Sequence, residues 1–120
     1  MKHFFFNFQT EVMDTSIQVF KILGIKKKEI IEGDSSHVLQ GVYYHYSIFG
    51  VQIKLELNSY GYDDKYRYML TVKKDVLSIV KPDEKTVDNV ANIVGSYLSK
   101  FLKEGVMYED NDELKPFITI

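Results

Sequence analysis

The chain contains no cysteine and no tryptophan, and Arg67 is the only arginine among its 120 residues. Without cysteine there is no disulfide framework, no cysteine nucleophile and no cysteine-ligated zinc or iron–sulfur centre. A single arginine disfavours nucleic acid as a partner, because phosphate and guanine recognition rely on the guanidinium fork. The rest of the composition, with 45% hydrophobic and 27% charged residues, is that of a folded globular protein. At this length we expect a single domain over residues 1–120.

Long hydrophobic runs are also missing. No stretch approaches the about 20 apolar residues of a membrane span. A secretory signal needs an apolar stretch of about 7–15 residues, whereas the N-terminal run Phe4–Phe6 is followed by Asn7, Gln9 and Glu11. We therefore expect a cytoplasmic protein without a membrane partner.

Two segments have the apolar spacing of helices. The first begins near Thr10 or Asp14, and Gly24 is its natural end. The second covers residues 82–105 and keeps its apolar stripe for five turns. Gly95 lies inside this helix at a cost of about 0.5–1 kcal/mol relative to alanine. We expect close packing of the helix against a sheet at that position.

Alternating apolar and polar side chains predict three strands between the helices, at residues 38–49, 51–59 and 66–73. Phe4, Phe6 and Phe8 predict a short strand or an extended arm at the N-terminus, and residues 114–120 a last strand. Residues 26–36 have the composition of a polar connection and turn, and residues 75–80 have no clear pattern. The prediction is an α+β fold: helix, three-stranded antiparallel meander, long helix and short β tail, with the helices on one face of the sheet.

Motifs that carry catalysis are absent from the sequence. There is no glycine-rich phosphate loop and no Gly-x-Ser-x-Gly nucleophile motif. His37 and His45 would lie about 26 Å apart along one strand, too far to share a metal ion. The acids after residue 108 lack the glycine and glutamate positions of a calcium loop. We therefore expect no catalytic residue, no cofactor, no metal and no enzymatic activity.

Two surface features suggest a binding role instead. Residues 104–113 contain five acids and no base, whereas residues 21–28 contain four lysines and no acid. Such runs are often plain solvated surface, but an acidic patch also attracts basic partners. The second feature is a tyrosine-rich turn, since tyrosine is favoured at interfaces. The candidate partner-binding residues are Tyr60, Tyr62, Asp63, Asp64, Glu109, Asp110, Asp112 and Glu113.

The stretch from Gly50 to Tyr60, followed by Tyr62, Asp63, Asp64 and Tyr66, resembles small bacterial immunity proteins. These proteins are partners of polymorphic toxins, including those of contact-dependent growth inhibition. The resemblance implies tight stoichiometric binding to the C-terminal domain of a cognate toxin, often a nuclease, without catalysis. Immunity proteins share no common motif, so the resemblance assigns no residue a role.

The order of the predicted elements is also similar to that of type III secretion chaperones, which are small, acidic and dimeric. This alternative implies a protein-binding module that holds an extended, unfolded segment. The chain departs from it because no convincing final helix follows the tail. A small-ligand domain is a third hypothesis. The sequence leaves open the partner, homodimer formation, the covered face of the sheet, and whether the acidic cluster or the tyrosine-rich turn forms the interface.

Overall fold

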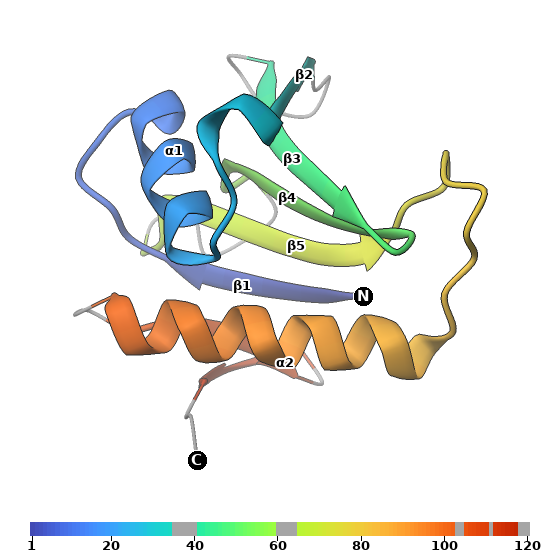
Figure 1. Ribbon diagram of the computed structural model, residues 1–120. Helices are drawn as coiled ribbons and strands as arrows, with labels where there is room; N and C mark the ends of the chain where they lie inside the picture. Colours follow the sequence, from blue (N-terminus) through green and yellow to red (C-terminus); the bar gives the residue numbers. More distant parts are fainter. Residues whose placement is uncertain (35–40, 60–64, 103–104, 111, 118–120) are drawn as a thin grey trace.

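In the residues that the structure describes, seven antiparallel strands and two α-helices form an α+β fold (Figure 1). The computed structural model describes residues 1–34, 41–59, 65–102, 105–110 and 112–117. The strand order across the sheet is β2-β3-β4-β5-β1-β6-β7. The elements are β1 (Lys2–Phe6), α1 (Val12–Ile22), the short 3-10 helix η1 (Lys27–Glu29), β2 (Ile31–Asp34), β3 (Val42–Ile48), β4 (Val51–Leu57), β5 (Tyr68–Lys74), α2 (Glu84–Phe101), β6 (Met107–Asp110) and β7 (Glu113–Pro116).

The N-terminal segment is an interior strand of the sheet and not an extended arm. Strand β1 lies between β5 and β6, with Phe4 opposite Leu70 and Phe5 opposite both Met69 and Met107. Phe4, Phe5 and Phe6 are all fully buried. Successive side chains of a strand point to opposite faces, so β1 places aromatic rings on both faces of the sheet.

The predicted meander is present as β3, β4 and β5, which pair in sequence order. The predicted sheet was nevertheless too small. Strand β2 lies where we expected a polar connection, and β6 and β7 form a hairpin where we expected one tail strand at 114–120. Ile31, Glu32 and Asp34 of β2 are exposed at the sheet edge, so the strand has no buried face to create an alternating pattern.

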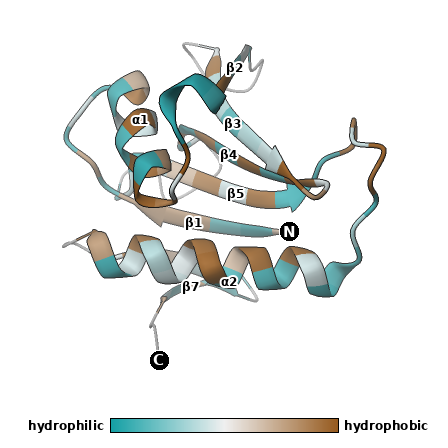
Figure 2. Cartoon of the chain, in the orientation of Figure 1, coloured by the Kyte–Doolittle hydropathy of each residue, from teal (hydrophilic) through white to brown (hydrophobic). Residues whose placement is uncertain are grey.

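Both helices contact the sheet, α1 at β3 and β4 and α2 at β5 and β1. Val19 and Phe20 of α1 and Val94 of α2 share one buried cluster with Leu55 and Leu70 of the sheet. On α2, Asp83 is the N-cap and accepts a hydrogen bond from the backbone N–H of Thr86 at 2.8 Å. Figure 2 shows the alternation of hydrophobic and hydrophilic residues along this helix.

The expectation for Gly95 is confirmed. A Cβ atom at this position would lie 2.7 Å from Cε1 of Phe4 and 2.8 Å from Cζ of Phe117. The helix therefore passes close to β1 and to the residue that follows β7. Neither of the two helices in the described part of the chain combines the length and the hydropathy that spanning a bilayer requires.

Candidate protein-binding surface

The structure brings four of the eight candidate residues together on one hairpin. Glu109 and Asp110 are half-buried at the end of β6, and Asp112 and Glu113 are exposed at the start of β7. Asp110 pairs with Glu113 in the register, and its carboxylate lies 3.1 Å from Nζ of Lys115. Lys115 is therefore an internal counter-charge in this acidic hairpin, which we define by the four acids. Tyr60, Tyr62, Asp63 and Asp64 lie outside the described residues.

A second surface lies at the end of the sheet where β3 turns into β4 and where β5 leaves for α2 (Figure 1). Phe49 is 74% exposed, Leu77 91% and Ile79 97%. In Figure 2 the loop between β5 and α2 protrudes from the sheet and is brown, that is hydrophobic, over much of its tip. Scattered single apolar side chains are normal on a protein surface, whereas here several are exposed on two adjoining segments. We call it the end surface and define it by Ile48, Phe49, Val76, Leu77, Ile79 and Val80.

Hydrogen bonds hold the two halves of the end surface together. The backbone N–H of Asp75 donates to the carbonyl of Gly50 at 2.8 Å. The Ser47 hydroxyl donates to Oδ2 of Asp75 at 2.7 Å, and the N–H of Leu77 donates to Oδ1 at 3.0 Å. The hydrogen bond from Ser47 is the main reason why the pKa of Asp75 lies below its ordinary value. The carboxylate thus ties the β3–β4 hairpin to the β5–α2 loop.

Gly50 is required by this arrangement. Its φ is 78°, and a Cβ atom there would lie 2.5 Å from the carbonyl oxygen of Val80 and 2.7 Å from Cδ of Pro82. Only glycine combines the left-handed backbone with such a close approach. The loop therefore lies directly against the hairpin, and the apolar side chains are presented from a fixed scaffold.

Phe49 is an unusual residue for its position. With φ values of 53° at Phe49 and 78° at Gly50, the turn between Ile48 and Val51 has the positive angles of a type I′ hairpin. Asparagine is favoured at the first of these positions, and a residue with a Cβ atom adopts the left-handed region at a cost of about 1–2 kcal/mol. The ring is mostly exposed, so burial does not offset this cost. Packing of the fold does not explain why a phenylalanine is here.

Charged side chains of both signs lie beside the end surface. Lys81 and Lys85 are exposed. The nearby acids have internal partners: Asp83 caps α2 and the carboxylate of Glu84 lies 3.0 Å from Nζ of Lys74. Hydrogen bonds from Thr86 lower the pKa of the Asp83 carboxyl group, and a hydrogen bond from Lys74 lowers the pKa of the Glu84 carboxyl group. The end surface therefore presents an apolar centre beside charged groups of both signs.

This surface corresponds to an apolar run in the sequence that periodic patterns do not explain. Val76, Leu77, Ile79 and Val80 are four apolar residues within five positions, between Asp75 and Lys81. They follow neither the period of a strand nor that of a helix, so they predict no buried face. The exposure of these side chains is evident only in the structure.

The sheet face opposite the helices carries a row of polar side chains. His3 pairs with Thr71, Thr71 with Lys54, and Lys54 with His45 across successive strands. Three strand spacings separate the two histidines by about 14 Å. Burial is the main cause that lowers the pKa of each imidazole. In the described part of the chain, no three His, Asp or Glu side chains are grouped to hold a metal ion.

The described residues thus form three distinct surfaces: an apolar end surface, an acidic hairpin and a polar sheet face. No protein-family model matches the chain, and comparisons with curated proteins and with solved structures find no similar protein.

Proposed function

We propose that this chain is a protein-binding module of the immunity type, which neutralises a folded toxin domain by stoichiometric binding and without catalysis. The observation that carries the proposal is the end surface, where Phe49, Leu77 and Ile79 are exposed on a scaffold fixed by hydrogen bonds. The resemblance of the sequence to immunity proteins supplies the kind of partner.

The shape of the end surface favours a folded partner. Leu77 and Ile79 are almost fully exposed, so they protrude as separate knobs that fit a preformed apolar cleft. Burying one such side chain contributes about 1.5–3 kcal/mol, and a few well-packed anchors carry most of the energy of an interface. Because the loop is already held in place, little conformational entropy is lost on binding.

The acidic hairpin gives the proposal its second element. Asp112 and Glu113 are exposed, and Glu109 and Asp110 are half-buried beside them. In this proposal they attract the basic surface of a toxin such as a nuclease and increase the association rate, as charge complementarity does generally. Tyr60, Tyr62, Asp63 and Asp64 remain predicted contacts of the same partner.

The test compares wild type with two double variants in the cells from which the sequence comes. Leu77→Ser with Ile79→Ser removes the knobs. Ile93→Ser with Phe101→Ser is the matched control, because these side chains are apolar and 58% and 56% exposed on α2. The tagged full chain is purified, the co-purifying domain is identified, and that domain is expressed with each variant while growth is measured.

We expect wild type and the control to bind the domain in equal amounts and to protect the cells, and the knob variant to do neither. All three should unfold at similar urea concentrations, because surface changes alter stability by about 0.5 kcal/mol or less. Equal protection by the knob variant would contradict the role of the end surface. A captured protein that binds only through an unfolded segment would replace the immunity function by the chaperone-like one.

A further inference from the structure

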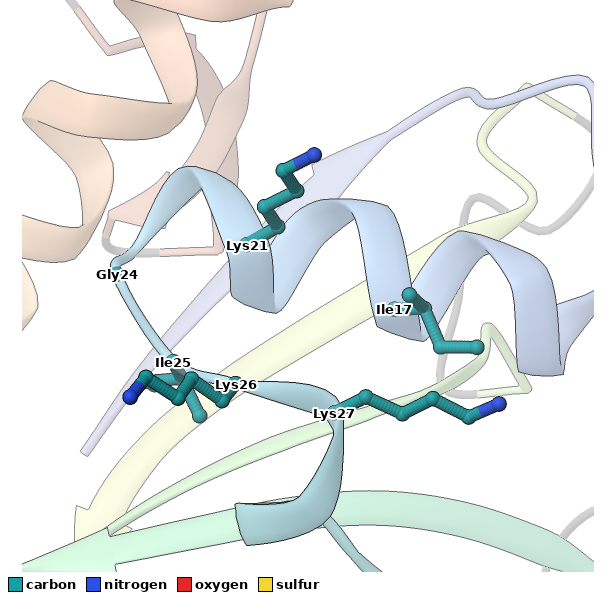
Figure 3. A pocket seen from close by; sticks show the side chains of 6 residues that line it. All are labelled: Ile17, Lys21, Gly24, Ile25, Lys26 and Lys27. Atoms are coloured by element: carbon teal, nitrogen blue, oxygen red, sulfur yellow. The ribbon is translucent and has the colours of Figure 1, made fainter.

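A groove runs beside α1, on a part of the molecule that the end surface does not include. Two adjoining hollows of about 390 Å³ and 140 Å³ lie between α1 and the chain from Gly24 to Glu32. They share Ile17 and Lys27 in their walls and so form one feature, which we call the α1 groove. Figure 3 shows the larger hollow, with α1 on one side and residues 25–27 on the other.

The floor of the α1 groove is apolar. Ile17 and the buried Ile25 line the larger hollow, and Met13, Ile30 and the buried Tyr44 line the smaller one. Such a floor accepts aliphatic side chains.

The rim of the groove is basic. Lys21, Lys26 and Lys27 line the larger hollow and are exposed. None of them forms an ion pair with another residue in the described ranges. The acid at the far end, Glu32, accepts a hydrogen bond from the Tyr44 hydroxyl at 3.0 Å. The groove therefore attracts negative charge along its rim.

The directions of the lysine side chains indicate the kind of ligand. In Figure 3 the Nζ atoms of Lys26 and Lys27 point toward opposite ends of the hollow, and that of Lys21 points outward from α1. Ammonium groups that diverge in this way do not converge on one small anion such as phosphate. They suit several carboxylates spaced along a longer ligand.

We propose that the α1 groove binds an acidic, aliphatic peptide segment of a partner protein, with aliphatic side chains on the apolar floor and carboxylates paired with the three lysines. The ligand combines the chemistry of the floor with that of the rim, and its length follows from the divergence of the ammonium groups. This site uses none of the end-surface residues, so it is independent of the proposed function.

The experiment measures the fluorescence anisotropy of labelled ten-residue peptides mixed with the full chain. One peptide alternates glutamate and leucine, a second alternates glutamate and glycine, and a third alternates lysine and leucine. The groove variant carries Lys21→Glu, Lys26→Glu and Lys27→Glu. The control carries Lys28→Glu, Lys65→Glu and Lys100→Glu, which changes the net charge equally at exposed lysines outside both hollows.

We expect the glutamate–leucine peptide to bind wild type and the control within twofold of each other, and the groove variant at least tenfold more weakly. The glycine and lysine peptides should each bind wild type at least tenfold more weakly. If both triple variants lost the same affinity for the glutamate–leucine peptide, net charge alone would explain the binding and the proposal would be overturned. Absence of binding to wild type at millimolar peptide would also overturn it. If wild type self-associates in sedimentation and the groove variant does not, the groove binds a second copy of this chain, and the proposed partner peptide is overturned.

Discussion

Replacing Gly95 of α2 by alanine should destabilise the protein, although alanine is the better helix former. The new methyl carbon would lie 2.7 Å from a ring carbon of Phe4 and 2.8 and 2.9 Å from two ring carbons of Phe117. Carbon atoms in ordinary contact are about 3.5–4.0 Å apart. Either the helix must move away from the sheet or both rings must shift.

Both rings pack against other aromatic rings. Phe4 is fully buried in β1 and packs edge-on against Phe117, with 5.5 Å between the ring centroids. Phe117 in turn contacts Tyr108 at 5.8 Å. Overpacking of this kind costs about 1–3 kcal/mol, whereas glycine to alanine in a helix gains about 0.8–1.0 kcal/mol. The expected net loss is about 1 kcal/mol in the free energy of unfolding.

Urea unfolding of wild type, Gly95→Ala and Asn92→Ala measures this balance. Asn92 is exposed on the same helix, so its replacement should stabilise the chain by up to about 0.7 kcal/mol through propensity alone. Gly95→Ala should cost less in a Phe117→Ala background, because contacting residues are coupled. If Gly95→Ala stabilises the chain as Asn92→Ala does, the close approach of α2 to Phe4 and Phe117 is wrong.

Two further predictions concern the end surface and the polar sheet face. Phe49→Asn should raise the free energy of unfolding by about 1 kcal/mol, because asparagine tolerates the left-handed turn; lower stability in urea would mean that the ring supports the fold. Burial, then the N-terminus and Lys54, lower the pKa of His3 in the folded chain. The unfolded chain therefore binds more protons than the folded chain, so the free energy of unfolding of wild type should fall as the pH drops from about 7 to 5. His3→Gln should have a shallower dependence, and an unchanged slope would contradict the lowered pKa.

The parts of the fold that the sequence predicts are those in which buried residues recur at a regular spacing. Helical spacing relates the buried residues of α2, which include Val87, Ala91, Val94 and Leu98. This spacing can be recognised from the sequence alone. In β4, Val51, Ile53 and Leu55 are buried, with half-buried residues between them. In each case a local period reflects the face that the element turns toward the core.

The sequence left β1 open as a strand or an extended arm, predicted part of β7 within residues 114–120, and missed β2 and β6. None of the four has a regular alternation of buried and exposed residues. Strand β1 buries Phe4, Phe5 and Phe6 alike, although successive side chains point to opposite faces of the sheet. Strand β2 is mostly exposed at an edge, and β6 and β7 have four residues each. Their places depend on pairing with strands far away in the sequence, which local periodicity does not encode.

The candidate site was only partly legible for a related reason. Charge can be read from composition, so Glu109, Asp110, Asp112 and Glu113 were identified, but the contact of Asp110 with Lys115 appears only in the folded hairpin. No periodic pattern in the sequence predicts the end surface, because its side chains are not buried on one face of a helix or strand.

Phe49 is the strongest reason to regard the end surface as functional. Its backbone angle is unfavourable for a residue with a Cβ atom, and its ring is mostly in solvent. A fold gains little from such a residue, whereas an interface gains an aromatic anchor. Phe49→Asn therefore separates the two roles, because it should increase stability while it decreases binding to the partner. A variant that gains stability and keeps full affinity would show that the ring lies outside the interface, and Leu77 and Ile79 would then have to carry the binding without it.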